Sequence, residues 1–296
     1  MAVPRRLRRQ AGRHALVDGI PFALPVNSDQ SPALMAAFPI NADKARALLP
    51  GNELHPLKVL GKGLLVVTVI DYRVTDIGKY IEYSIAIACT HGRRPPPPVL
   101  PLVFMKSFGV GQYVLDLPVS TEISVKGGKG IWGMPKHRAS LDFLIGDEWV
   151  SSQYDLDDQM VMRIDVKRPK SAWLPLNMGA VNYCQFRGML MKSYIYFRGK
   201  IGFSLFRKGS ARLTIGDHPR IQPLRALDIG AEPMFAGFFP QTHGVLDDHF
   251  EAWFLTHDQP PHESPEGLES VVDLGLGEEW LEPPRRPGDP VSPVSA

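Results

Sequence analysis

The chain has very little cysteine, no long apolar run and no excess of charge of either sign. Cys89 and Cys184 are its only cysteines. They form neither a CxxC pair nor a metal-binding spacing, so we expect no disulfide framework and a cytoplasmic protein. No stretch of about 18 apolar residues is present, which argues against a membrane-spanning helix. A net charge of +2 is too small to predict a nucleic-acid or membrane partner.

The composition of the two ends differs from that of the middle. The chain begins MAVPRRLRRQ without the apolar segment of a signal peptide, and we interpret residues 1–30 as a basic N-terminal arm. Residues 258–296 are dominated by proline and charge, which predicts a loosely held tail in which 274–282 is the candidate for a docked element. The apolar and patterned middle, residues 31–257, is expected to form one domain.

One helix and many strands are expected between the two ends. Asn41 is a suitable N-cap, a short amphipathic stretch follows it, and Pro50-Gly51 end the helix. Most other segments are rich in β-branched and aromatic residues, with turn residues between them. We expect strands at 63–74, 80–90, 99–108, 138–145, 148–156, 159–166, 186–197, 201–206, 211–215 and 233–239. Many short strands and few helices predict an antiparallel β-rich barrel or sandwich with helices packed outside.

The expected strand at 80–90 has two different faces because side chains alternate along a strand. One face is bulky and suits a core: Ile81, Tyr83, Ile85, Ile87 and Cys89. The other face is small and partly polar: Tyr80, Glu82, Ser84, Ala86 and Ala88. This second face either meets solvent or leaves room for a ligand inside a barrel, with Glu82 pointing into it. The strand alone leaves both alternatives open.

The segment 126–139, KGGKGIWGMPKHRA, combines glycines with basic residues and a tryptophan. Its Gly127–Gly130 stretch lacks the spacing and the Lys-Ser/Thr ending of a phosphate-binding loop. Neither GxSxG nor HExxH occurs in the chain, and no metal spacing is present, so lysine is the remaining candidate nucleophile. A lysine that follows a proline, such as Lys136, is by itself most often a surface cation.

The same segment resembles the active-site motif of the acetoacetate decarboxylase family. Gly133–His137, GMPKH, is similar to the Tyr-Pro-Lys-Lys core of that family, whose Schiff-base lysine corresponds to Lys136. Gly78–Glu82, GKYIE, is similar to the family's Gly-Cys-Tyr-Thr-Glu motif, whose active-site glutamate corresponds to Glu82. Further similar motifs keep the family's order: Leu48–Pro50, Asn182-Tyr183 and 211–229. The collinear set covers about residues 35–240.

The resemblance implies an α+β, β-rich fold: an antiparallel β-barrel-like domain with a few peripheral helices and a central pocket, assembled as a homo-oligomer. It also implies chemistry without a cofactor, in which Lys136 forms a Schiff base and Glu82 manages protons. A lysine amine must be neutral to attack a carbonyl, yet with a pKa of about 10.4 only about one in 2500 is neutral at pH 7. Acetoacetate decarboxylases are a known example of a lysine pKa lowered by burial or a nearby cation, so this expectation comes with the resemblance.

His137 stands where the family has a second lysine. Histidine is mostly neutral at pH 7, so it repels a neighbouring ammonium less than lysine does. We therefore expect burial by Trp132 and Met134 to matter more for the reactivity of Lys136. His137 and Arg138 are expected to act as further modulators of the pocket.

A second difference lies near the N-terminus, where the family's arginine falls near Ser31 and no arginine occurs between Arg13 and Arg46. We therefore expect a substrate other than acetoacetate itself, such as a larger oxo acid. The leading hypothesis is a carbon–carbon lyase that decarboxylates a β-keto acid, acetoacetate-like or larger, through Lys136. One alternative is an aldolase–dehydratase that uses the same lysine and differs in its product. The other is a non-catalytic protein that binds an apolar or steroid-like ligand, with an ordinary pKa at this lysine.

Overall fold

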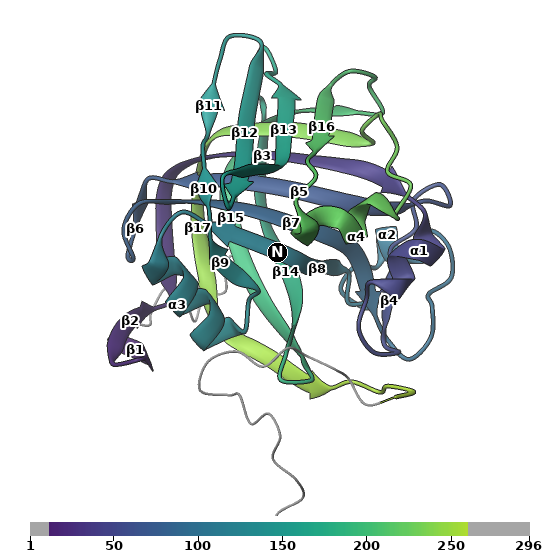
Figure 1. Ribbon diagram of the computed structural model, residues 1–296, viewed down its shortest axis with the longest axis horizontal. Helices are drawn as coiled ribbons and strands as arrows, with labels where there is room; N and C mark the ends of the chain where they lie inside the picture. The colour runs from purple at the N-terminus through teal and green to yellow at the C-terminus, as the bar shows by residue number, and fades with distance from the viewer. Residues whose placement is uncertain (1–11, 260–296) are drawn as a thin grey trace, which may run out of the picture. The chain divides into compact units, whose positions relative to one another are not determined.

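The computed structural model describes residues 12–259, and within them seven strands close into a barrel (Figure 1). Around the barrel their order is β7 (Tyr80–His91), β5 (Gly63–Tyr72), β3 (Val26–Ile40), β17 (Phe235–Phe254), β15 (Met189–Leu205), β14 (Leu174–Phe186) and β8 (Gly111–Val119). The antiparallel pairing of β8 with β7 closes the barrel. All neighbours are antiparallel except β14 and β8, which run parallel and are joined by a long excursion of the chain.

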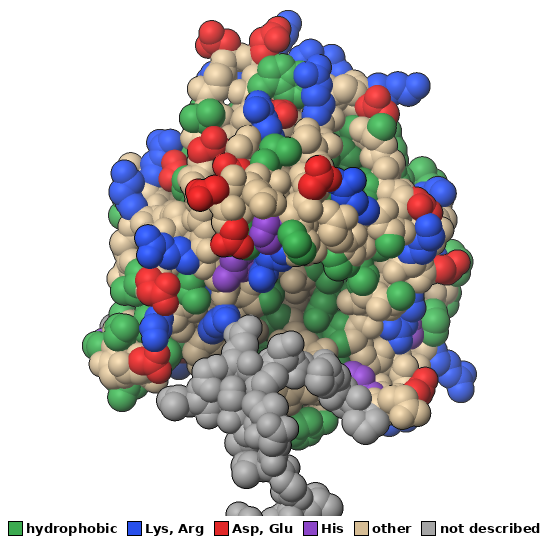
Figure 2. Space-filling view, viewed as in Figure 1, with side chains coloured by type: hydrophobic (Ala, Val, Ile, Leu, Met, Phe, Trp, Pro, Cys, Tyr) green, Lys and Arg blue, Asp and Glu red, His purple; other side chains and the backbone are tan. Residues whose placement is uncertain are grey.

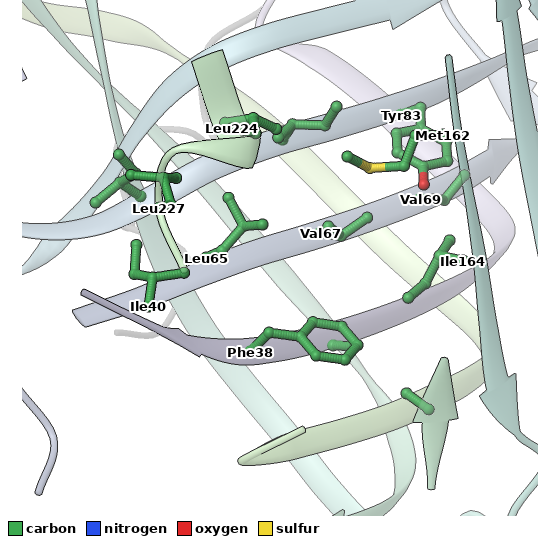
Figure 3. Close-up of a cluster of buried hydrophobic side chains, with 14 of the residues drawn as sticks. Phe38, Ile40, Leu65, Val67, Val69, Tyr83, Met162, Ile164, Leu224 and Leu227 are labelled. Carbon is green, nitrogen blue, oxygen red and sulfur yellow. The ribbon is translucent and has the colours of Figure 1, made fainter. Parts of the chain in front are cut away.

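A smaller sheet packs against the outside of the barrel and completes the main core. It contains β10 (Ser140–Leu141), β12 (Trp149–Leu156), β13 (Gln159–Lys167) and β16 (Ala211–Ile215), with β11 (Leu144–Ile145) paired to β12. Side chains of β5 and β7 meet those of β12 and β13 in this core (Figure 3). Its fully buried members include Leu65, Val67, Val69, Tyr83, Ile85, Val150, Tyr154, Met162 and Ile164. Alternation along β7 therefore sends Tyr83 to this core and Glu82 to the barrel interior.

The remaining elements are short. The hairpin β1 (Arg13–Val17) and β2 (Ile20–Leu24) stands apart from the barrel sheet, to which β4 (Leu54–Pro56), β6 (Val74–Thr75) and β9 (Lys136–Arg138) belong. The helices are α1 (Ala42–Ala47), α2 (Leu100–Val103), α3 (Glu122–Trp132), α4 (Gln222–Arg225) and the 3-10 turn η2 (Pro219–Ile221). No helix within residues 12–259 has the length and apolar character needed to cross a bilayer. The prediction of a β-rich, barrel-like fold with a few peripheral helices is confirmed.

The helix expected after Asn41 is confirmed as α1. The Asn41 side-chain oxygen accepts hydrogen bonds from the backbone N–H groups of Asp43 and Lys44, at 3.0 and 3.2 Å. These bonds satisfy two of the N–H groups that the first turn of a helix leaves unpaired. The sequence signal succeeds here because capping depends on residues only a few positions apart.

The strand expected at 99–108 is wrong, because this segment forms α2 and the turns that follow it. Pro101 lies in the first turn of α2, where its missing N–H is not needed. The apolar residues that suggested a strand are instead largely exposed: Val99, Leu100, Leu102, Val103, Phe104 and Met105. The strand expected at 138–145 is also wrong as one element, since it is broken into the ends of β9, β10 and β11.

Helix α3 is not indicated by the sequence, because Gly127, Gly128 and Gly130 disfavour helices. Tertiary packing explains two of these glycines. A Cβ at Gly127 would lie 2.8 Å from the Phe22 ring, and a Cβ at Gly130 would lie 2.4 Å from the Val17 side chain. The glycines therefore allow the β1–β2 hairpin to approach α3 closely.

The described part of the expected N-terminal arm is structured. Residues 13–24 form β1 and β2, and β3 begins at Val26. Phe22 of β2 is only 2% exposed and packs on α3, which holds the hairpin in place. The first 11 residues and 260–296, including the candidate element at 274–282, lie outside the described residues. Acidic and basic side chains are interspersed over the face shown in Figure 2, as a net charge of +2 leads one to expect.

Candidate active site

Lys136 reaches the barrel interior because α3 ends just before it. Gly133 adopts a left-handed conformation at the end of α3, with a φ of 64°, which glycine tolerates without a Cβ clash. Its N–H donates to the Lys129 carbonyl at 3.0 Å, and the N–H of Met134 donates to the Gly128 carbonyl at 3.1 Å. The chain then enters β9, where Lys136 lies beside Leu117 in the parallel pairing with β8.

Gly128 leaves the space through which the Lys136 side chain passes. A Cβ at this position would lie 2.3 Å from Cδ and 2.7 Å from Cε of Lys136. Non-bonded carbon atoms do not approach this closely, so any larger residue at Gly128 would displace the lysine side chain. The glycine-rich stretch that resembles a phosphate loop is therefore a helix whose glycines accommodate neighbouring side chains.

The Lys136 amine contacts a carboxylate, a hydroxyl and an aromatic ring inside the barrel. Its Nζ lies 2.7 Å from Oε2 of Glu82 and donates a hydrogen bond to Oγ of Ser124 at 3.0 Å. It also lies 5.4 Å from the centre of the Tyr80 ring, within the range of a cation–π contact. Lys136 is 6% exposed and the Glu82 side chain 12% exposed. The pair thus forms a buried salt bridge in which each partner compensates the charge of the other.

Two stacked tyrosines border this ion pair. The rings of Tyr72 and Tyr80 lie 4.6 Å apart at an angle of 24°. Burial, followed by the negative charge of Glu82, raises the pKa of both hydroxyls well above their usual value. Both therefore stay protonated at neutral pH and can donate hydrogen bonds next to the amine.

A cavity of about 130 Å³ lies inside the barrel beside this cluster. Lys136, Glu82, Trp132 and Met134 all line it, so the structure brings together four of the residues expected at the pocket. Its walls are otherwise mainly apolar, with Val114, Leu117, Ile195, Phe197 and Leu246 among the lining side chains. Tyr80, Glu82 and Ser84 on the small face of β7 line this cavity. Of the two alternatives for residues 80–90, solvent or a ligand space inside the barrel, the structure therefore favours the second. Among the described residues, Lys136 is the only cation in the lining.

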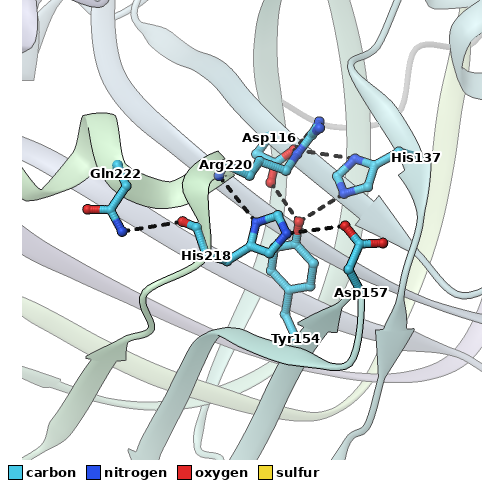
Figure 4. Close-up of polar contacts among 7 residues, drawn as sticks. All are labelled: Asp116, His137, Tyr154, Asp157, His218, Arg220 and Gln222. Carbon is cyan, nitrogen blue, oxygen red and sulfur yellow. Dashed lines mark hydrogen bonds and ion pairs between the residues drawn. The ribbon is translucent and has the colours of Figure 1, made fainter.

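His137 and Arg138 are not among the residues that line this cavity. His137 follows Lys136 on β9, so its side chain points to the opposite face. There it lies in a polar cluster between the barrel and the smaller sheet (Figure 4), with Nε2 2.9 Å from the Tyr154 hydroxyl and Nδ1 3.4 Å from Asp116. Burial, which outweighs the attraction of Asp116, lowers the pKa of His137. Arg138 is exposed.

The polar cluster depends on an irregularity in β8. Ile85 pairs with Asp116 and Ala86 with Val114, so β8 has one extra residue at this point. Such a bulge reverses the alternation of side chains that follow it. Leu117 consequently lines the cavity, and Asp116 turns outward to accept hydrogen bonds from Tyr154 at 3.2 Å and from Nε of Arg220 at 2.9 Å.

Ser31, the position near the family's N-terminal arginine, is fully buried in β3. Its hydroxyl donates to the Asp29 carbonyl at 3.0 Å, and it does not line the cavity. Among the described residues, no arginine lines the cavity. Ser124 and Gly128, which contact Lys136 directly, were missed by the sequence analysis, since neither residue carries a motif that signals such a contact.

A buried lysine–carboxylate pair, neutral hydroxyls and a mainly apolar cavity have the features of a small-molecule site in which an amine can act as nucleophile. Residues 9–185 match the family model of acetoacetate decarboxylase. The chain belongs to the acetoacetate decarboxylase family, as its resemblance predicted. No curated protein sequence matches the chain significantly.

Several solved structures have a similar fold. An acetoacetate decarboxylase from Legionella pneumophila subsp. pneumophila is 14% identical, with 83% of this chain and 90% of that chain covered and a TM-score of 0.54. The enduracididine biosynthesis enzyme MppR complexed with pyruvate is 16% identical, with coverages of 77% and 90% and a TM-score of 0.54. MppR complexed with the condensation product of pyruvate and imidazole 4-carboxaldehyde is also 16% identical, with 77% of this chain and 88% of that chain covered and a TM-score of 0.50. At these identities the similarity establishes the fold.

Proposed function

We propose that this protein is a carbon–carbon lyase that decarboxylates a β-keto acid through a Schiff base on Lys136. The observation that carries the proposal is the buried Lys136–Glu82 pair, 2.7 Å apart in the cavity of the barrel, in a member of the acetoacetate decarboxylase family. Burial excludes water from a reactive amine, and the carboxylate stands where it can accept the ammonium proton.

The reaction begins when Glu82 takes a proton from the Lys136 ammonium. The neutral amine attacks the ketone carbon, and the resulting carbinolamine loses water to give an iminium cation. The bond to the β-carboxylate then breaks, CO2 leaves, and the electron pair moves into the iminium to form an enamine. Protonation of the enamine carbon and hydrolysis of the imine release a ketone and restore the amine.

The surroundings of the pair suit the steps in which charge changes. A mainly apolar wall favours loss of a carboxylate as neutral CO2, because it solvates the ionised acid poorly. The protonated hydroxyls of Tyr72 and Tyr80 already hydrogen-bond to one another, and oxygen atoms of bound intermediates can compete for these bonds. The iminium itself accepts the electron pair, so the proposed reaction requires no cofactor.

An aldolase–dehydratase acting on an oxo acid is the second candidate. Its support is the shared fold with MppR, a structure of which contains the condensation product of pyruvate and an aldehyde. The same lysine would form the Schiff base in both reactions. The two candidates differ in products, since decarboxylation releases CO2, whereas condensation joins two carbonyl compounds and releases water.

Borohydride reduction during incubation with β-keto acids and small ketones tests the proposal. We expect a covalent adduct on Lys136, measured by intact mass and peptide mapping, and no adduct in Lys136→Met. Lys192→Met is the matched control, because Lys192 is also partly buried and lies 3.0 Å from a glutamate, Glu251, but is not in the cavity lining. A folded protein that binds these ketones yet gives no adduct would exclude both reactions and favour a non-catalytic binding protein.

We further propose that the protein works in the cytoplasm as a homo-oligomer. Both cysteines are free and buried, which suits a reducing compartment, and exposed apolar residues on the described surface suit assembly.

A further inference from the structure

Two amide side chains face the cavity away from the ion pair. Gln112 on β8 and Asn182 on β14 are partners in the parallel register of these strands, and both line the cavity. Nε2 of Gln112 donates a hydrogen bond to Oδ1 of Asn182 at 2.8 Å. Asn182 is buried, with 5% exposed. The bond between the two amides therefore determines which of their polar groups remain for a ligand in the cavity.

The amide pair leaves one whole NH2 group and one whole carbonyl oxygen unused. Each amide has an NH2 group and a carbonyl oxygen. The bond between them leaves the Gln112 oxygen and the Asn182 NH2 group without a partner, since within residues 12–259 neither side chain makes another hydrogen bond. If both amide groups were rotated by half a turn, Asn182 would donate to Gln112, and one NH2 group and one carbonyl oxygen would still remain unused. A group that both donates and accepts therefore complements the pair.

The amide pair and Lys136 are far apart along the barrel wall. Lys136 lies beside Leu117, and Gln112 precedes Leu117 by five positions on β8. At about 3.3 Å per residue, five positions extend over about 16 Å, somewhat less where the strand bulges. Val114 lines the cavity between them. A ligand that contacts both ends must therefore have an apolar middle.

We propose that Gln112 and Asn182 determine substrate specificity by binding a neutral hydrogen-bonding group at the far end of the substrate. This inference rests on the proposed Schiff-base function. A hydroxyl or amide group satisfies both amides, whereas a carboxylate would face the lone pairs of a carbonyl oxygen. Because Lys136 is the only cation among the described lining residues, a second carboxylate would also be buried without a counter-charge. The substrate class is thus an elongated β-keto acid with a hydroxyl- or amide-bearing tail.

Matched ketones test the inference, because ketones are the products of such a decarboxylation. The probes are 7-hydroxy-2-heptanone, 2-octanone, which has the same number of non-hydrogen atoms, and 7-oxooctanoate, which ends in a carboxylate. Calorimetry gives their overall dissociation constants, and any reversible Schiff base contributes alike because all three probes are methyl ketones. We expect wild-type protein to bind the hydroxy ketone about three- to tenfold more tightly than 2-octanone, as a neutral hydrogen bond provides, and 7-oxooctanoate more weakly than either.

Gln112→Leu should remove the preference for the hydroxyl group. The ratio of the two dissociation constants is taken within each protein, so a general loss of affinity cancels. Asn177→Leu is the matched control, because Asn177 is an exposed amide on β14, the strand of Asn182, and does not line the cavity. The control should keep the wild-type ratio.

Three results would overturn the inference. They are equal affinities for the two neutral ketones in wild-type protein, an unchanged ratio in Gln112→Leu, and tightest binding of 7-oxooctanoate. Borohydride trapping of the same ketones tests Lys136 separately. A preserved hydroxyl preference without any Lys136 adduct would reject the Schiff-base function and leave the amide pair as a ligand contact.

Discussion

At the scale of single residues, Glu82 contacts the Lys136 ammonium and, in the proposed reaction, also accepts its proton. The two atoms lie 2.7 Å apart with little solvent around them. A carboxylate at this distance is within reach to accept a proton from the amine. The glutamate is therefore as important to the proposed chemistry as the lysine.

Replacing Glu82 by glutamine should slow formation of the Lys136 adduct by about a hundredfold or more, the usual loss when a general base is removed. The amide keeps the shape of the side chain but cannot accept the ammonium proton. The measurement is the rate of borohydride-trapped adduct formation at several pH values, together with a melting curve to confirm folding.

Glu251→Gln is the control for this experiment, because Glu251 also pairs with a lysine, Lys192, at 3.0 Å and does not line the cavity. Its trapping rate should stay close to that of wild-type protein. A Glu82→Gln variant that traps ketones as fast as wild type would show that another group removes the proton.

His137 should make the fold less stable in mild acid. Its pKa is lowered by burial from an ordinary value of 6.5, so below about pH 6.5 the unfolded chain binds a proton that the native protein does not. Stability therefore falls as pH drops from 6.5 toward the lowered pKa. In His137→Gln the free energy of unfolding, measured with urea between pH 7.5 and 5, should fall less steeply than in wild type.

His14→Gln is the comparison for the pH experiment, since His14 is exposed on β1. Its unfolding free energy should follow the wild-type pH dependence. If His137→Gln also followed that dependence, burial of His137 would not contribute to acid sensitivity.

At the scale of elements, α3 positions Lys136 from two directions. Ser124 lies in its first half and accepts a hydrogen bond from the amine, while Gly128 leaves space for the lysine side chain. The left-handed Gly133 then turns the chain into β9. A helix and a three-residue strand thus act as one unit that presents the lysine to the cavity.

Gly128→Ala should lower adduct formation at Lys136 by at least tenfold. In an ordinary helix this change stabilises by about 0.5–1 kcal/mol. Here the new Cβ would lie 2.3 Å from Cδ of Lys136, so the lysine must leave its position near Glu82. Trapping kinetics measure the effect, and circular dichroism verifies that the helix persists.

Gly130→Ala separates displacement of the lysine from general disturbance of α3. A Cβ at Gly130 would lie 2.4 Å from Val17, so this variant disturbs the hairpin rather than the lysine. Its melting temperature should fall while trapping stays within about twofold of wild type. Equal losses of trapping in both variants would contradict a specific role for the space at Gly128.

At the scale of the whole molecule, the segment after the proline run is an exposed apolar patch. Val99, Val103, Phe104 and Met105 are 63%, 66%, 54% and 53% exposed. An apolar group of this kind marks an interaction site more often than an ordinary surface. We expect a second copy of the chain to cover it.

The double variant Val103→Asp/Phe104→Asp should shift the protein to a smaller assembly, because burial of two carboxylates at an interface is costly. Sedimentation or light scattering measures the mass. Leu60→Asp is the control, since Leu60 is a single exposed apolar residue, 81% exposed, and does not belong to this segment of the chain. A double variant with the same mass as wild type would place the interface elsewhere.

How much of this protein can be derived from its sequence depends on the distance over which each signal acts. The Asn41 cap, the alternating strands and the order of the family motifs are local patterns. They correctly indicated α1, most barrel strands and the family. The apolar segment at 99–108 misled because apolar character alone does not distinguish a buried strand from an exposed patch.

The sequence by itself determined the chemical groups of the site, since the motifs around Lys136 and Glu82 identify a lysine and a carboxylate in fixed order along the chain. Only the tertiary structure decided which groups meet them. Closure of the barrel places Glu82 against Lys136, α3 adds Ser124, and the pairing of β8 with β14 joins Gln112 to Asn182. These contacts join residues far apart in the chain, so their geometry depends on strand register and on a bulge that no local pattern encodes.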